Sequence, residues 1–268
     1  MISKAFWEKV KLIKVEKPVE TLKKYIVKSS KENKLVEVKN IAQIYKTFKS
    51  EKVIFENLSF DIHQGDKLAL IGANGCGKTT IVELICGFKN ASAGSITYNF
   101  GEGVNPHKSI GVQFQDLSFP RNLSVRNVID FVVSLDGTAI DEKELEEMLL
   151  IFSLTSILDS KAHKLSGGQQ QRLNVILSLL SKPKLLFLDE FTTGLDIAVK
   201  KNIRDFLIKF CDKYKITFVI ISHDIEAMSQ MVNRAIVIHD KEIYIDASID
   251  DVNKKFGTLY KMVDKYII

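Results

Sequence analysis

"LALIGANGCGKTT", residues Leu68 to Thr80, is the stretch that decides the predicted fold. An apolar run before Gly72 indicates a buried strand, and the residues after Lys78 indicate a helix. Between them, Gly72, Gly77, Lys78 and Thr79 match the pattern G-x-x-x-x-G-K-[S/T]. In such a loop, backbone N–H groups point at phosphate oxygens. We therefore predict a phosphate-binding loop in an α/β fold, with Lys78 reaching the β- and γ-phosphates and Thr79 binding Mg²⁺.

The predicted phosphate contacts extend over the whole loop. They are Gly72, Ala73, Asn74, Gly75, Cys76, Gly77, Lys78, Thr79 and Thr80. Cys76 occupies a free position of the pattern and is more typical of a tolerated small residue than of a redox switch, although its oxidation would block nucleotide binding. The alternative, a glycine turn that binds nothing, is disfavoured because the required strand and helix both flank the loop.

Two more apolar runs end in polar residues: "KLLFLDE" at Lys184–Glu190 and "ITFVIISHD" at Ile216–Asp224. Continuous apolar runs are typical of strands buried on both faces of a parallel sheet. At the ends of these runs, we predict Asp189 as a Mg²⁺ partner, Glu190 as the general base for water, and His223 as a γ-phosphate contact. The alternatives are two solvated turn carboxylates and a structural histidine.

The composition of the 268-residue chain, 46% apolar and 26% charged, indicates one sizeable core with a smaller attached unit. No apolar run approaches the roughly 18–20 residues of a membrane span, and no secretory signal is recognised. Three cysteines without CxxC spacing argue against a disulfide framework or a zinc site and favour a reducing cytosol. Residues 1–34 hold ten Lys and four Glu and therefore carry a charge of +6. Because the whole chain has a net charge of +5, the remaining residues are near −1, and they predict no nucleic-acid surface.

Residues 1–34 are predicted to be a basic N-terminal extension, either a solvated tail or a helix that binds a membrane surface or a partner. Short β-rich runs follow at 35–38 and 55–62. Between about 117 and 163, three segments predict helices: "LSVRNVIDFVVSL", "DEKELEEMLLIF" and "LTSILD". Asp141 is a fair N-cap for the second, with Glu144 completing a pattern like a capping box.

These motifs together carry a family resemblance. The phosphate loop, "LSGGQQQR" at Leu165–Arg172, "LLFLDE" at Leu185–Glu190, "TGLD" ending at Asp196, and His223 resemble ATP-binding cassette (ABC) ATPases in order and spacing. The resemblance covers about residues 35–245. It implies a phosphate-loop core with a mixed sheet, an antiparallel β subdomain, and a helical subdomain at about 117–163, followed by a helical tail at 246–268.

The resemblance also implies roles for single residues. Gln115 matches the glutamine that touches Mg²⁺ and the attacking water and senses the transmembrane partner; Gln113 is a rival for this role. Tyr45 matches the aromatic residue that stacks on adenine, unless it is an ordinary strand aromatic. The signature residues are expected to face the γ-phosphate bound to a second subunit: Ser166, Gly167, Gly168 and Gln169.

The implied function is an ATP-binding and hydrolysing subunit that powers a membrane transporter through ATP-driven dimerisation. Its partners would be transmembrane permease subunits and a second ATPase subunit, identical or homologous, at the cytoplasmic face of the membrane. The segments 119–137 and 256–266 are loosely similar to drug- and polymer-export ATPases, which favours export. A non-transport ABC ATPase of translation or DNA maintenance is the alternative. Phe191 replaces the family's usual proline, so a looser turn and an altered rate are expected.

Overall fold

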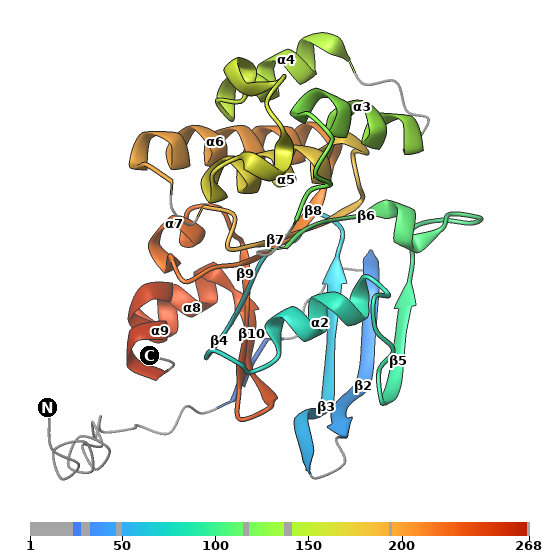
Figure 1. Ribbon diagram of the computed structural model, residues 1–268. Helices are drawn as coiled ribbons and strands as arrows, with labels where there is room; N and C mark the ends of the chain where they lie inside the picture. The colour runs from blue at the N-terminus through green and yellow to red at the C-terminus, as the bar shows by residue number, and fades with distance from the viewer. Residues whose placement is uncertain are drawn as a thin grey trace, which may run out of the picture.

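Two sheets and a layer of helices make up the described part of the chain, residues 24–27, 33–46, 50–114, 118–136, 141–192 and 195–266 of the computed structural model (Figure 1). Within these residues the larger sheet is seven-stranded, in the order β1 (Tyr25–Ile26), β10 (Glu242–Ser248), β9 (Arg234–His239), β4 (Lys67–Gly72), β8 (Thr217–Ile221), β7 (Leu185–Asp189) and β6 (Ile110–Gln113). The β9–β10 pair is antiparallel and the other pairs are parallel, so the sheet is mixed.

A smaller antiparallel sheet joins β3 (Glu51–His63), β2 (Lys34–Lys46) and β5 (Ala93–Tyr98). It matches the expected antiparallel β subdomain. Strand β1 pairs with β10 from within the predicted extension, and β10 runs past the predicted limit at residue 245. The domain limits themselves remain a prediction.

Two apolar cores lie on the two faces of the larger sheet, because alternate side chains of a strand point to opposite faces. In β4, Leu68 and Leu70 face the core shared with the small sheet and helix α2 (Lys78–Ile85). Ala69 and Ile71 face the core that the remaining helices cover. The helix that follows the phosphate loop is thereby separated from the other helices by the sheet (Figure 1).

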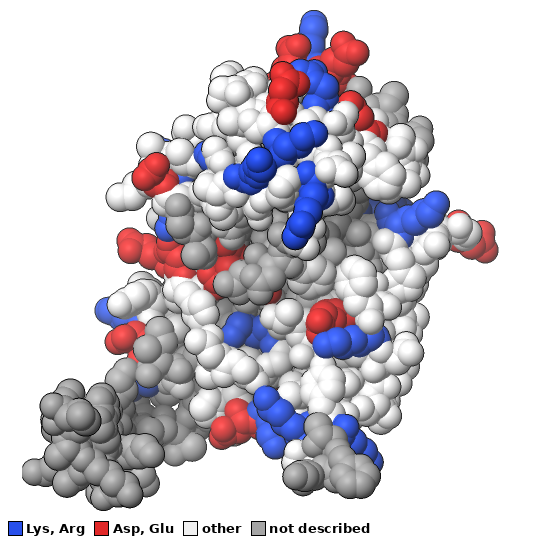
Figure 2. Space-filling model, viewed as in Figure 1, with Lys and Arg blue, Asp and Glu red and all other residues white. Residues whose placement is uncertain are grey.

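The second core is covered by helices α3 (Val125–Asp136), α4 (Glu142–Ile151), α5 (Gly167–Leu180), α6 (Ile197–Tyr214), α7 (Ile225–Ser229), α8 (Ile249–Phe256) and α9 (Leu259–Tyr266). In the view of Figure 2, the outer surface of the upper helices carries charges of both signs. Among the described helices, none is long and apolar enough to cross a membrane.

The predicted helical segments are confirmed with two corrections. Asp141 caps α4 by accepting a hydrogen bond from the Lys143 N–H at 2.9 Å. Glu144 does not complete a capping box: its buried carboxylate accepts from the Tyr214 hydroxyl at 2.6 Å and the Lys213 ammonium at 2.8 Å. "LTSILD" forms only the 3₁₀ turn Thr155–Ile157, and similar turns occur at Pro106–Ser109 and Ala162–Lys164.

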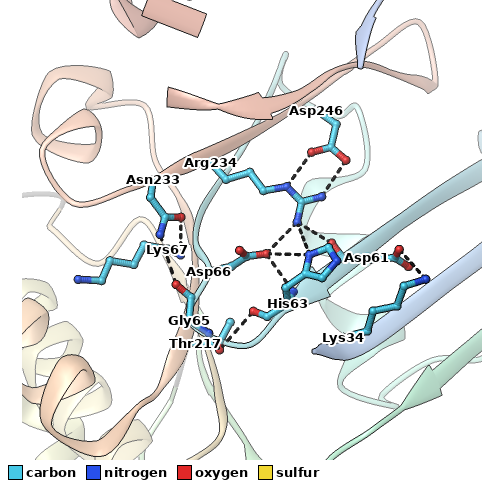
Figure 3. Close-up of polar contacts among 10 residues, drawn as sticks. All are labelled: Lys34, Asp61, His63, Gly65, Asp66, Lys67, Thr217, Asn233, Arg234 and Asp246. Carbon is cyan, nitrogen blue, oxygen red and sulfur yellow. Dashed lines mark hydrogen bonds and ion pairs between the residues drawn. The ribbon is translucent and has the colours of Figure 1, made fainter. Parts of the chain in front are cut away.

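A buried polar network, which we call the Arg234 cluster, joins the two sheets at the start of β4 (Figure 3). The Arg234 guanidinium donates to both carboxylate oxygens of Asp246, at 2.7 and 2.8 Å, and to Asp66 at 2.8 Å. It also donates to the Asp61 carbonyl at 2.9 Å and contacts His63 Nδ1 at 3.1 Å. Burial disfavours the charge, but the hydrogen bonds and charges of Asp246 and Asp66 outweigh it and raise the pKa of Arg234. The cluster thus fixes the turn from which β4 runs to the phosphate loop.

Candidate nucleotide site

The loop between β4 and α2 has the curled shape that a phosphate loop requires. Gly77, the N-cap of α2, has a φ of 105°, and a Cβ atom there would lie 2.5 Å from Ile54 Cγ2. A Cβ atom on Gly72 would lie 2.5 Å from Cys76 Sγ and 2.7 Å from the Ile238 carbonyl oxygen. These two positions therefore require glycine because of the backbone angle at one and the close neighbours at both.

The positive charge of the loop is already positioned. The Lys78 ammonium donates to the carbonyl oxygens of Gly72, at 2.7 Å, and Ala73, at 3.1 Å. The first turn of α2 contains no acidic residue, so the partial positive charge of its N-terminus is not neutralised there. Ala73, Asn74 and Gly75 are exposed. The loop can therefore present N–H groups, an ammonium and a helix terminus to one anion.

Thr79 and Asp189 meet at the position predicted for Mg²⁺. The Thr79 hydroxyl donates to Asp189 Oδ2 at 3.3 Å, which brings the end of β7 to the start of α2. Burial raises the pKa of Asp189, and the nearby Glu190 adds to this effect, while the Thr79 hydrogen bond opposes it. Hydroxyl and carboxylate oxygens suit Mg²⁺, which commonly takes one or two protein carboxylates and completes its coordination with phosphates and water. Among the described residues there is no cluster of three or more His, Cys, Asp or Glu that could hold a metal ion.

Glu190 is held in an unusual conformation directly after β7. Its φ is 54°, in the left-handed region, and its N–H donates to the Ile221 carbonyl at 2.9 Å. Its Oε1 accepts a hydrogen bond from the His223 N–H at 2.9 Å and lies 3.8 Å from His223 Nε2. The His223 side chain is 62% exposed, so it can reach a ligand beside the carboxylate. The structure thus brings Glu190 and His223 together at the ends of neighbouring strands.

Phe191, at the position where the family usually has proline, is packed into the core. Its side chain is only 3% exposed and belongs to the core beneath the helices. A proline would restrict the backbone, whereas this buried aromatic side chain anchors the turn by packing. The looser turn and the altered rate that the missing proline predicts both stay predictions.

Of the two glutamines predicted as candidates for contact with Mg²⁺ and water, the structure describes only Gln113. Gln115 lies outside the described residues, so its predicted role stays a prediction. Gln113 is fully buried, and its amide oxygen accepts from the Asp189 N–H at 3.1 Å while its amide nitrogen donates to the Phe114 carbonyl at 2.8 Å. Gln113 therefore holds the end of β7 and does not point outward as a rival to Gln115 would.

Tyr45 has a neighbour that the sequence did not indicate. Its hydroxyl accepts from the Lys89 ammonium at 3.1 Å, and this ammonium lies 5.3 Å from the ring centroid. Lys89 also pairs with Glu83 at 2.7 Å. The hydrogen bond to Glu83, followed by that to Tyr45, raises the pKa of Lys89. Stacking of adenine on Tyr45 remains a prediction, with a lysine now placed beside the ring.

The signature residues lie apart from this group of residues. Ser166 is the N-cap of α5 in a capping box: its hydroxyl accepts from the Gln169 N–H at 3.3 Å, and its own N–H donates to Gln169 Oε1 at 2.9 Å. Helices α5 and α2 pack on opposite faces of the larger sheet (Figure 1). A Cβ atom on Gly167 would have no neighbour within 4 Å. The described chain therefore gives no packing reason for glycine at 167.

Comparison with known proteins identifies one family. The family model described as "ABC transporter" matches residues 55–193, slightly more than half of the chain. The spermidine/putrescine import ATP-binding protein PotA of Mannheimia succiniciproducens is 30% identical over 239 residues, which cover 87% of this chain and 62% of that protein. The sulfate/thiosulfate import ATP-binding protein CysA of Pseudomonas syringae pv. tomato is 32% identical, covering 76% of this chain and 64% of that one. The chain thus spans about three fifths of the length of these relatives.

Solved structures support the fold. The ATP-binding subunit of an ABC transporter superposes with a TM-score of 0.74 at 21% identity, covering 86% of this chain and 99% of that one. A dimeric ATP-binding cassette bound to ADP and phosphate superposes with a TM-score of 0.70 at 24% identity, covering 80% and 98%. The mixed sheet, the antiparallel sheet and the helical layer are therefore those of an ABC ATPase cassette.

Proposed function

The chain belongs to the ABC transporter family, and we propose that it is the ATP-binding and ATP-hydrolysing subunit of a membrane transporter. The observation that carries this proposal is the meeting of three strand ends. Lys78 and Thr79 follow β4, Asp189 and Glu190 end β7, and His223 follows β8, with Thr79 bonded to Asp189 and Glu190 bonded to His223. Residues suited to bind phosphate, to bind a metal ion and to activate water therefore lie together at one edge of the sheet.

Each residue has a distinct part in hydrolysis. Lys78 and the N–H groups at the start of α2 hold the β- and γ-phosphates. Thr79 and Asp189 would hold Mg²⁺, which would neutralise charge on the phosphates. Glu190 accepts a proton from the attacking water, and its carboxylate is aimed by the His223 N–H. His223 contacts the γ-phosphate from the exposed side.

A second subunit completes the site. Ser166 and Gly167 are exposed at the start of α5, a helix whose later residues pack on the face of the larger sheet opposite α2. They are therefore available to another copy or a homologue. We propose that they face the γ-phosphate held by the partner, and that ATP draws the two subunits together. Gly167, which has no close neighbour in its own chain, leaves room for that approach.

The subunit would work with transmembrane permeases, which would hold it at the cytoplasmic face of the membrane. The relatives named above are import ATP-binding proteins, and they give no support to the predicted export. Export is therefore not part of the proposed function.

Affinity purification from membranes tests this assignment. A co-purifying protein with several membrane spans, together with ATP turnover by the complex, is the expected result, and the permease would also indicate the direction of transport. A chain that co-purifies with ribosomes and no permease would overturn the transport role.

Replacing the base tests the chemistry. Glu190→Gln removes the proton acceptor but retains the shape of the side chain, so ATP affinity should stay within about threefold while turnover falls by 10² or more. ATP should then trap the dimer, as seen by gel filtration. Turnover equal to that of the wild type would exclude Glu190 as the base.

A further inference from the structure

Three consecutive glutamines of the signature segment, Leu165–Arg172, have three different partners. Gln169 closes the capping box with Ser166. The Gln170 amide donates to the Leu165 carbonyl at 3.1 Å and, more weakly, to the His163 carbonyl at 3.4 Å. The Gln171 amide donates to the backbone carbonyl of Glu190. The last bond leads out of the signature segment and directly to the residue predicted to be the base.

This bond acts on a residue whose other groups are also held. The N–H of Glu190 is bonded to the Ile221 carbonyl and its carboxylate to the His223 N–H. The next side chain, Phe191, is buried in the core. Because Glu190 has a φ of 54°, a conformation that non-glycine residues adopt only when their surroundings impose it, each of these contacts helps to set where the carboxylate points.

The helix start can transmit a displacement to this bond. Ser166 caps α5 and Gln171 lies five residues further on, about 7.5 Å along the helix axis. The capping box satisfies the N–H groups of Ser166 and Gln169, and the Ser166 carbonyl accepts from the Gln170 N–H at 2.9 Å. These hydrogen bonds join Ser166 to the turn that carries Gln171, so the two should move together. A ligand that shifts Ser166 therefore also shifts the donor on the Glu190 carbonyl.

We propose that Gln171 is a positioning residue that couples the two ATP sites of the dimer. This inference rests on the proposed function. When the partner's nucleotide docks against Ser166 and Gly167, the rigid start of α5 sets the Gln171 amide, and that amide sets the orientation of Glu190 in the chain's own site. Nucleotide on one site thereby readies the base of the other, and this link is a coupling free energy between two distinct sites.

The first test replaces the amide with an apolar side chain of similar length. Gln171→Met should lower kcat by about tenfold, the cost of one lost hydrogen bond, with the KM for ATP unchanged because the Gln171 amide bonds to the Glu190 backbone and lies outside the phosphate loop. The matched control, Gln170→Met, removes bonds in the same helical turn that do not reach Glu190, and its kcat should stay within about threefold of the wild type. Should Gln171→Met fail to fold, Gln171→Glu keeps the shape and lacks the donor.

The second test separates positioning from a general structural role. Residual turnover of radiolabelled ATP is compared between Glu190→Gln and the double variant Glu190→Gln with Gln171→Met. If Gln171 acts through Glu190, its loss should have no further effect once the base is gone. A tenfold loss in both backgrounds, or a Gln171→Met kcat within twofold of the wild type, would overturn the proposal. A wild-type protein that turns over no ATP would instead refute the proposed function.

Discussion

At the scale of single residues, the loop shows how packing tunes chemistry. Cys76 lies in the phosphate loop with its sulfur against Gly72. Burial raises the pKa of the Cys76 thiol, although the charge of Lys78 opposes this, and burial raises the pKa of Cys86 and of Cys211 to about 12. A raised pKa lowers the thiolate fraction and so the reactivity of each thiol.

Alkylation by iodoacetamide should reflect these differences. At pH 8 we expect Cys76, which is only half-buried, to react slowly and first, while Cys86 and Cys211 react only on unfolding. Since a raised pKa lowers the thiolate fraction at a given pH, the Cys76 rate should climb steadily as the pH rises from 7 to 9.5. MgATP should protect Cys76. Peptide mass spectrometry measures each rate; equal rates at the three sites, or no protection by ATP, would contradict this prediction.

At the scale of elements, the first residues of α5 have two roles: Ser166 caps the helix, and Ser166 and Gly167 are proposed to face the partner's nucleotide. Ser166→Arg, an obvious variant to block dimerisation, would also remove the capping box and cost about 1 kcal/mol of stability. Gly167→Ala is a cleaner change because the added Cβ meets no atom of its own chain within 4 Å. Any packing conflict it creates must therefore come from outside the described chain.

For Gly167→Ala we expect a melting temperature equal to or above that of the wild type, since alanine favours helix over glycine by up to about 1 kcal/mol. Dimerisation driven by ATP should weaken by at least about tenfold, because the methyl group occupies space that the partner's nucleotide needs. Gel filtration and calorimetry in the Glu190→Gln background measure both. A normal dimer with normal stability would show that Gly167 does not face the partner.

At the scale of the whole molecule, the elements that a local pattern encodes could be predicted and the contacts between distant elements could not. Strands β4, β7 and β8 were apparent from apolar runs that end in polar residues. The role of Glu144 was missed because its partner Lys213 lies 69 residues away, and no local sequence pattern indicates that the two side chains meet. The bond from Gln171 to Glu190 was missed for the same reason, since only folding brings α5 beside the end of β7. Lys89 beside Tyr45 is a third such case.

The Arg234 cluster is another contact between distant elements: buried Arg234 of β9 reaches the Asp61 carbonyl and His63 of β3. Arg234→Met retains the apolar stem but removes the guanidinium that donates to the fully buried Asp66 and to Asp246, so the free energy of unfolding should fall by about 3–5 kcal/mol. The matched control is Lys67→Met, which breaks the more exposed pair with Asp212 and should cost no more than about 1 kcal/mol.

Urea unfolding distinguishes a local from a global effect when it is followed in two ways: by far-ultraviolet circular dichroism, which reports secondary structure, and by ATP binding. Because the cluster fixes the turn that leads through β4 to the phosphate loop, both signals should be lost together at the same lower urea concentration. ATP affinity of the folded variant should stay within about threefold of the wild type, since no member of the cluster reaches the loop. If ATP binding is lost well before the sheets unfold, the cluster supports the site locally and does not join the two sheets into one cooperative unit.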